Sequence, residues 1–247
     1  MDKPDSRRLR GHGTRPVRTA FTLVELLAAL AVVGVLAALL LAVFSRVQTS
    51  GRSVQCVSNL RQWGVALTLY ANDNNGAYPR RGQGIQPITK IDVPEDWFNS
   101  LPPYAGQGSF VDAVRAGRPP KPGDRSIFVC PAAARSKSGT YFLPYAMNMY
   151  LSPTIRPLPH NRVLIPNPMQ LAFLADGPVA WSSTVPSSQG YSVPARHGGR
   201  ANVCFVDGHV GSFDGAYLGC GVGQPRPERD DVRWQPGAGG VDQPLVP

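Results

Sequence analysis

The 247-residue sequence lacks the short motifs that mark several large enzyme classes. It contains no Gly-x-Ser-x-Gly nucleophile turn, no His-Glu-x-x-His zinc motif and no glycine-rich phosphate-binding loop. A serine hydrolase with that turn, a zinc metalloprotease and a nucleotide-driven motor therefore have no support from the residues. The run His-Gly-Gly-Arg at 197–200 is similar to an esterase oxyanion loop, but without a nucleophile turn it predicts no activity.

Cysteine is scarce, and no two cysteines are spaced as Cys-x-x-Cys. This spacing argues against a zinc ribbon and against thioredoxin-type redox chemistry. If the chain is exported, its cysteines can form one or two disulfides, with three full pairings open, or remain as buried thiols in strands. The candidates are Cys56, Cys130, Cys204 and Cys220.

Glycine and proline, by contrast, are abundant, with 26 and 25 residues. This composition favours short strands, turns and long loops over a helical bundle. The formal net charge is +9, and the first twenty residues carry six cations against two acids. A basic flank before an apolar segment keeps the N-terminus in the cytoplasm. Outside that flank no basic stripe is interleaved with aromatic residues, so nucleic acid is not expected as a partner.

An apolar run from Phe21 to Phe44 predicts one membrane-spanning helix. At 1.5 Å per residue the run is about 36 Å long, and the core of a bilayer is about 30 Å thick. A cleavable secretory signal has an apolar stretch of only about 7–15 residues, so this segment is too long for one. We expect a single-pass protein whose C-terminal part is exported.

The residues after the apolar run continue as an amphipathic helix. Arginine and glutamine occupy the other faces, and Asn-Asp-Asn-Asn-Gly at 72–76 is a strong stop signal. We therefore predict one helix over residues 21–72, of which 21–44 form the transmembrane part. The predicted apolar face of the second part consists of Val47, Val54, Val57, Leu60, Gly64, Leu67 and Ala71.

Glu25 is an acidic residue inside the apolar run. A charge in a transmembrane helix costs about 2.5–3.5 kcal/mol at the centre and less near an end. If the chain is cut between Ala20 and Phe21, the new amino group of a neighbouring copy could pair with this carboxylate in a helical assembly. Small residues along the segment would let neighbouring helices approach closely, namely Ala28, Ala29, Ala31, Gly34, Ala37 and Ala38.

The run RTAFTLVELL, followed by AALAVVGVLAALLLAVF, resembles the signal of type IV prepilins and type II secretion pseudopilins. The resemblance implies that residues 1–20 are a leader, that a prepilin peptidase cuts after Ala20, and that the amino group of Phe21 is methylated. Most such signals have glycine where this chain has Ala20. The resemblance also implies that Glu25 sets the register between subunits. Its further implied partners are other pilin or pseudopilin subunits, an inner-membrane assembly platform and an ATPase, with the C-terminal domain in the periplasm or outside the cell.

Residues 73–220 are expected to form a globular α+β domain of pilin-like architecture, with the long N-terminal helix packed on a small antiparallel β-sheet. A short helix is expected within 96–106, and strand-forming runs lie at 126–131, 141–151 and 169–177. Asp207 and Gly208 separate two further strands, 203–206 and 209–213, which predicts a hairpin with a two-residue type I′ turn. The tail, 221–247, is rich in proline and glycine, and we expect it to be disordered or draped over the domain.

The run CVSNLRQWGVALTLYANDNNGAYP at 56–79 resembles the helix end of a large subgroup of prepilin-like proteins. Members of that subgroup carry a histidine, nine residues and then Asp-Gly, a spacing that His197, Asp207 and Gly208 reproduce. The runs FVCP around Cys130 and PYAMNMYL around Asn148 also fit. The resemblance implies membership of the subgroup and assigns no role to the histidine or the aspartate.

His197, Asp207 and His209 are the residues that invite a catalytic or metal-binding interpretation, because imidazole and carboxylate groups bind zinc and similar ions. A structural role is the favoured interpretation, in which Asp207 bonds within its turn and His197 braces it or a loop carbonyl. We therefore expect no metal and no cofactor. Calcium is the remaining alternative, with Asp176, Asp207 and Asp214 as oxygen ligands, although no EF-hand-like series of acids is present.

These patterns predict a non-enzymatic structural subunit, a pilin or pseudopilin of a type II secretion or type IV pilus-like filament. A second hypothesis is a membrane-tethered module that binds envelope polysaccharide or DNA and uses the helix only as an anchor. A third is a metal-dependent envelope enzyme built on His197 and Asp207. The first two differ in what they require of Glu25, since only assembly needs its charge.

Overall fold

A computed structural model of the chain describes residues 22–82, 91–133, 141–152, 161–177, 187–188, 193–220 and 229–235. The chain consists of two compact units, residues 1–45 and residues 46–247. The leader and the predicted cleavage site between Ala20 and Phe21 lie outside the described residues.

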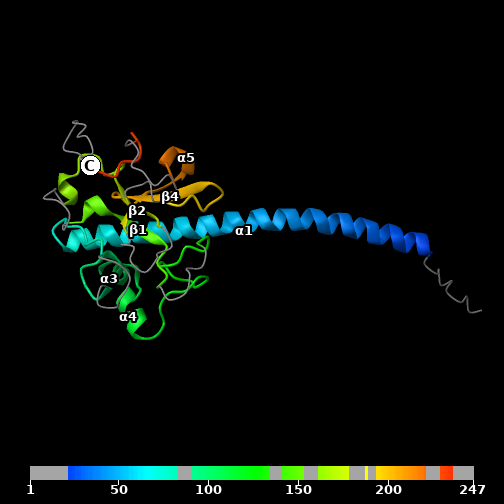
Figure 1. Cartoon of the computed structure of the whole chain (residues 1–247), viewed down its shortest axis with the longest axis horizontal. Helices are drawn as coiled ribbons and strands as arrows, with labels where there is room; N and C mark the ends of the chain where they lie inside the picture. Colours follow the sequence, from blue (N-terminus) through cyan, green and yellow to red (C-terminus); the bar gives the residue numbers. More distant parts are fainter. Residues whose placement is uncertain are drawn as a thin grey trace, which may run out of the picture. The chain divides into compact units, whose positions relative to one another are not determined.

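The N-terminal element is one long helix, α1, which runs from Leu23 to Asp73 (Figure 1). The helix ends one residue beyond the predicted end at 72, while the predicted start at residue 21 lies outside the described residues. Its stretch Leu23–Leu41 is, within the described part of the chain, the one helical segment long and apolar enough to cross a membrane. The large apolar side chains of this stretch are exposed, as expected for a surface that meets lipid or other helices.

The C-terminal half of α1 supplies the centre of the main hydrophobic core. Its buried positions recur at steps of three and four residues from Cys56 onward, which is the periodicity of one helical face. Val47 and Val54, which the periodicity placed on that face, are 60% and 66% exposed, so the packed face begins later than predicted. Its members are Cys56, Asn59, Leu60, Trp63, Gly64, Ala66, Leu67 and Ala71.

The end of α1 follows the predicted stop signal. The amide of Gly76 donates to the carbonyl of Ala71 over 2.6 Å, and Gly76 has a φ of 83°. Asn75 is the one non-glycine residue with positive φ in the described part of the chain, at 54°. Asparagine and glycine tolerate this left-handed backbone better than other residues, so the helix stops here.

A five-stranded sheet packs with α1. Its strands are β1 (Tyr145–Asn148), β2 (Ala172–Asp176), β3 (Ser187–Ser188), β4 (Arg200–Phe205) and β5 (Val210–Asp214). The order across the sheet is β3-β1-β2-β4-β5, and all neighbouring pairs are antiparallel except β1 with β3. The predicted α+β arrangement of an N-terminal helix and a small antiparallel sheet is confirmed.

The run 126–131, predicted as a strand, instead forms turns against α1. The indole Nε1 of Trp63 donates to the carbonyl of Ile127 over 2.9 Å, and the amide Nδ2 of Asn59 donates to the carbonyl of Val129 over 2.7 Å. Helix side chains thus satisfy backbone groups that a strand would have paired with a neighbour. Tertiary contacts outweigh the local β-propensity of the run.

Alternate side chains of a strand point to opposite sides of the sheet, and the side chains of β4 are buried on both sides. Cys204 belongs to the core that α1 fills, whereas Val203 and Phe205 belong to a second cluster. That second cluster is covered by the short helix α5 (Gly215–Leu218) and by residues 229–235, whose Trp234 is buried. Part of the predicted tail is therefore packed, with the carbonyl of Trp234 accepting a hydrogen bond from Asn148 Nδ2.

Short helices cover the other side of the C-terminal half of α1, opposite the strands (Figure 1). The indole of Trp63 meets the ring of Trp97 edge-on, with ring centroids 5.0 Å apart, and the ring of Phe128 at 5.5 Å. These aromatic contacts fix the short helices against α1. These helices are α3 (Trp97–Ser100), α4 (Phe110–Arg115) and the adjoining 3-10 turn η1 (Pro102–Ala105). Two further 3-10 turns, η2 (Met149–Leu151) and η3 (Arg162–Leu164), lie between β1 and β2 in the sequence.

Candidate functional site

The first turn of α1 is closed by a reciprocal capping interaction between Thr22 and Glu25. The backbone amide and the hydroxyl of Thr22 each donate to Glu25 Oε2 over 2.9 Å, and the amide of Glu25 donates to Thr22 Oγ1 over 3.2 Å. This is the capping box that Thr-x-x-Glu favours at a helix start. The carboxylate therefore stabilises its own helix end before any contact with another chain, a role that the apolar pattern around it did not indicate.

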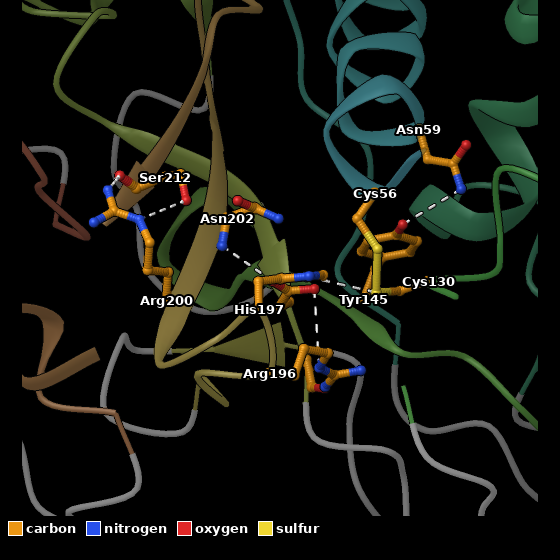
Figure 2. A network of polar contacts seen from close by, with 11 residues as sticks. Cys56, Asn59, Cys130, Tyr145, Arg196, His197, Arg200, Asn202 and Ser212 are labelled. Carbon is orange, nitrogen blue, oxygen red and sulfur yellow. Dashed lines mark hydrogen bonds and ion pairs between the residues drawn. A yellow bond between two sulfur atoms is a disulfide. The ribbon is translucent and has the colours of Figure 1, made fainter. Parts of the chain in front are cut away.

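A second candidate site is a buried polar cluster centred on Asp176 and His197 (Figure 2). Asp176 is the last residue of β2, and its side chain is fully buried. His197 Nε2 lies 3.1 Å from Asp176 Oδ2, and the histidine side chain is only 1% exposed. The backbone amide of Asn202 donates to the same carboxylate oxygen over 3.0 Å.

Two glycines place His197 at this point. The amide of His197 donates to the carbonyl of Arg200 over 3.0 Å, and the amide of Arg200 donates back over 3.3 Å. Between them Gly198 and Gly199 both have positive φ, 64° and 84°, as the two central residues of a type I′ turn require. The run His-Gly-Gly-Arg is thus a tight turn that presents the imidazole to β2.

Arg196 supplies the positive charge beside Asp176. Its Nε lies 4.0 Å from Asp176 Oδ1, and its guanidinium also donates to the carbonyl of Gly177. The arginine side chain is 9% exposed and the aspartate side chain is fully buried. A buried carboxylate needs such a partner, because the interior does not solvate an isolated charge. Burial lowers the pKa of Arg196, and the nearby Asp176 opposes that shift.

The Cys56–Cys130 disulfide borders the cluster. It joins α1 to the loop at 130 with a Cα–Cα distance of 5.2 Å, and Cys130 Sγ lies 3.7 Å from His197 Nε2. Figure 2 shows Cys56, Cys130, Arg196 and His197 gathered around this point. Of the other candidate cysteines, Cys204 and Cys220 are free thiols. Burial raises the pKa of both thiols, to about 11 for Cys220, so neither is a reactive thiolate at neutral pH.

Several polar atoms of the cluster are buried and lack a hydrogen-bond partner within the described structure. They belong to the Asp176–Arg196 ion pair and to the two polar side chains beside it, and they include both donors and acceptors. Buried polar groups are paired in most folded proteins, so unpaired ones often mark a place where water or an ion binds. The atoms are Asp176 Oδ1, Arg196 Nη1, His197 Nδ1, and Oδ1 and Nδ2 of Asn202.

Asp207 lies in a different arrangement and pairs with His209. Asp207 Oδ1 is 2.7 Å from His209 Nδ1 and also accepts the backbone amide of His209 over 3.1 Å. The imidazole of His209 stacks on the ring of Phe205 with centroids 4.2 Å apart. The predicted brace between His197 and Asp207 is therefore wrong: the partner of His197 is Asp176.

The β4–β5 turn also differs from the predicted two-residue type I′ turn. Its loop spans Val206–His209, since the amide of Gly208 donates to the carbonyl of Phe205 and the amide of Phe205 donates to the carbonyl of His209, both over 2.9 Å. Gly208 has a φ of 93°, whereas Asp207 is not among the described residues with positive φ. A type I′ turn needs positive φ at both central positions, so a longer loop with a single left-handed glycine forms instead.

The predicted ligand sets are not assembled. Within the described residues, the one group of potential metal ligands whose atoms lie within 4.8 Å of one another is Cys56, Cys130, Asp176 and His197. It includes neither Asp207 nor His209. The calcium candidates are also separate, because Asp214 Oδ1 accepts the amides of Ala216 and Tyr217 as the N-cap of α5. The buried cluster was missed because its four residues come from segments far apart in the sequence, and no local spacing connects them.

Comparison with known proteins gives one match. Residues 15–41 match the family model described as the prokaryotic N-terminal methylation motif. The match covers residues 15–20 at the end of the basic flank, the Thr22–Glu25 capping box and the apolar stretch Leu23–Leu41 of α1. No curated protein and no solved structure matches the chain.

Proposed function

Because the chain carries a prepilin-type signal followed by a single apolar helix, we propose that it is a structural subunit of a type IV pilus or type II secretion filament. A prepilin peptidase removes residues 1–20 and methylates Phe21. Before assembly, the mature subunit is anchored in the inner membrane with its folded domain on the periplasmic side. An assembly platform and its ATPase then move it into the filament, where α1 packs on copies of itself or on related subunits.

The observation that carries this proposal is the methylation motif placed directly on the start of α1. Cleavage after Ala20 leaves Phe21 as the first residue, immediately before the Thr22 cap. The exposed apolar side chains of Leu23–Leu41 supply a surface that must be covered by lipid or by other helices. When a subunit moves from the membrane into the filament, the helices of neighbouring subunits replace lipid around these apolar side chains.

The motif points to a structural subunit rather than an enzyme. Buried histidine and cysteine groups in the folded domain fit this, since a catalytic group must reach its substrate. His197 is nearly inaccessible, and the two free thiols have raised pKa values. The folded domain then acts through its surface in the assembled filament.

The test is the mass of the N-terminal peptide after co-expression with a prepilin peptidase. We expect a peptide that begins at Phe21 and is heavier by one methyl group. A matched variant, Ala20→Glu, places a charged side chain before the cut and should keep the full leader while still inserting. A wild-type chain that retains residues 1–20 in the presence of active peptidase contradicts the proposal, and the alternative of a simple membrane tether would then hold.

A further inference from the structure

We propose that Cys56, Cys130, Asp176 and His197 form a redox-gated zinc site, which binds Zn²⁺ when the Cys56–Cys130 disulfide is reduced. One potential ligand atom from each of the four residues lies within 4.8 Å of the other three. The four residues come from α1, the loop at 130, the end of β2 and the type I′ turn. In the oxidised chain the two sulfurs are bonded to each other, and the site is a disulfide beside an ion pair.

The spacing of the ligand atoms fits a tetrahedral zinc ion. Zinc–sulfur bonds of about 2.3 Å and zinc–nitrogen or zinc–oxygen bonds of about 2.0–2.2 Å imply ligand–ligand distances of roughly 3.3–3.8 Å. His197 Nε2 is 3.7 Å from Cys130 Sγ, which is within this range, and 3.1 Å from Asp176 Oδ2, which is slightly below it. Reduction breaks the sulfur–sulfur bond, and repulsion between the two sulfurs then moves them toward the same spacing.

The donor set and its burial predict a structural rather than a catalytic site. Two thiolates, an imidazole and a carboxylate complete four-coordination, which leaves no open position for substrate. All four residues are buried, and the side chains of Asp176 and His197 are 0% and 1% exposed. The amide of Asn202 holds the carboxylate, and the type I′ turn holds the imidazole, so two ligands are oriented before the ion arrives.

Charge balance supports both states of the site. In the oxidised state, the negative Asp176 is offset by the positive Arg196, whose Nε lies 4.0 Å away. In the reduced state, Zn²⁺ adds two positive charges and the two thiolates add two negative ones. The buried cluster is therefore neutral in each state, which avoids the large cost of an uncompensated interior charge.

The buried atoms without hydrogen-bond partners lie beside the proposed ligand atoms and are not the ligand atoms themselves. Asp176 Oδ1, His197 Nδ1 and the side-chain amide of Asn202 are buried and lack a hydrogen-bond partner within the described structure, although Arg196 Nε lies 4.0 Å from Asp176 Oδ1. A disulfide offers none of them a strong hydrogen bond. His197 Nε2 and Asp176 Oδ2 would bind the ion, and Nδ1 and Oδ1 would remain available for hydrogen bonds that orient the two ligands.

The reaction balances with a dithiol as the reductant. The dithiol transfers two electrons and two protons to the disulfide, which yields two cysteine thiols and the disulfide of the reductant. Zinc binding then displaces the two thiol protons to the buffer. The disulfide links α1 to the loop at 130 in the oxidised state, and the zinc ion would link both of these to β2 and the type I′ turn in the reduced state. The domain therefore keeps a cross-link between α1 and the loop at 130 when its redox environment changes.

The test uses the full-length protein in detergent, with Cys204→Ala and Cys220→Ala introduced so that Cys56 and Cys130 are its sole cysteines. One sample is reduced with a phosphine and another stays oxidised; both receive Zn²⁺, are desalted without oxygen and are analysed for metal. We expect about one zinc ion per reduced chain and almost none per oxidised chain. Co²⁺ in place of Zn²⁺ should give the absorption of tetrahedral thiolate coordination.

His197→Ala should weaken zinc binding at least about 100-fold, because one of four ligands is lost. His209→Ala is the matched control, since this second histidine also pairs with an aspartate but lies outside the cluster, and it should bind like the parent. Circular dichroism of the oxidised variants confirms that they are folded. Absence of zinc in the reduced parent, equal zinc in the oxidised parent, or unchanged affinity in His197→Ala would each overturn the proposal. If the reduced parent unfolds, refolding on addition of Zn²⁺ supports the site, and failure to refold contradicts it.

Discussion

Gly64 in α1 and Gly208 in the β4–β5 turn touch through their backbones. A Cβ atom on Gly64 would lie 2.8 Å from the Cα of Gly208 and 2.9 Å from Cys204 Sγ. These separations are shorter than any van der Waals contact, so the helix reaches the sheet this closely only because residue 64 has no side chain. The Asp-Gly of the histidine–aspartate spacing therefore serves packing: Gly208 is where the hairpin meets the helix.

Gly64→Ala should destabilise the domain by about 1–3 kcal/mol despite the better helix propensity of alanine. The added methyl group meets backbone and a buried sulfur, neither of which can move without shifting the hairpin. Gly51→Ala is the matched control on the same helix, because a Cβ there has nothing within 4 Å. It should stabilise by about 0.5–1 kcal/mol. Urea unfolding followed by tryptophan fluorescence measures both, and equal effects would contradict the close packing.

Glu25 has two candidate roles, as part of the helix cap and as a charged partner for a neighbouring subunit. Two substitutions are needed to separate them. Glu25→Gln keeps an oxygen that accepts the amide of Thr22 but removes the charge, whereas Thr22→Ala removes the side-chain cap and keeps the charge. If the carboxylate pairs with the amino group of Phe21 in a neighbouring subunit, Glu25→Gln should abolish filaments and Thr22→Ala should only reduce them. Filament yield by electron microscopy and membrane insertion by fractionation give the readout. Normal filaments from Glu25→Gln would mean that the charge is dispensable.

The ionisation of Asp96 should make the stability of the folded domain depend on pH. Its side chain is fully buried before α3, and burial raises its pKa from 3.8 to about 6, against the opposing effect of Arg80, whose Nε is 3.7 Å away. Between these two values the folded chain keeps a proton that the unfolded chain has lost. Stability therefore falls as pH rises through this window and stays lower above it, by at most about 3 kcal/mol.

Asp96→Asn removes this ionisation and should remove the pH effect with it. The side chain of Asp96 makes no capping hydrogen bond to α3, so the amide loses no such bond. Urea unfolding at intervals from pH 4 to 8 should show a variant that gains on the wild type up to about pH 6 and then keeps a constant advantage. Arg80→Gln should extend the window upward, because Arg80 favours the charged carboxylate. A difference between Asp96→Asn and wild type that does not vary with pH would refute the assignment.

The sequence was sufficient for features that depend on local pattern. Apolar length and periodicity located α1, and the Asn-Asn-Gly signal located its end, because left-handed backbone is a property of the residues themselves. The cluster around His197 required information of another kind. Its partner Asp176 is 21 positions earlier, and the two meet only because β2 and the type I′ turn are brought together by the sheet.

The turns were also predictable only in part, because local sequence and tertiary packing both determine their type. Asp-Gly and Gly-Gly both permit positive φ, and the sequence alone favoured the first as a type I′ turn. In the structure Gly198 and Gly199 form that turn, while Gly208 serves a longer loop whose shape is set by contact with Gly64. The residues define which turns are allowed, and packing on α1 selects among them.

The ion pair of Asp176 with Arg196 should be far more important for stability than an exposed pair. Asp176→Asn leaves the nearly buried guanidinium without a counter-charge, which costs about 3–5 kcal/mol in such sites. Asp92→Asn is the matched control, because Asp92 pairs with Arg115 while both side chains are about half exposed. Exposed pairs contribute about 0–1 kcal/mol, so this control should unfold almost like wild type. Arg196→Met combined with Asp176→Asn should recover part of the loss, since the unpaired charge is gone. If both single aspartate variants lose the same stability in urea, Asp176 is not the buried partner that its geometry indicates.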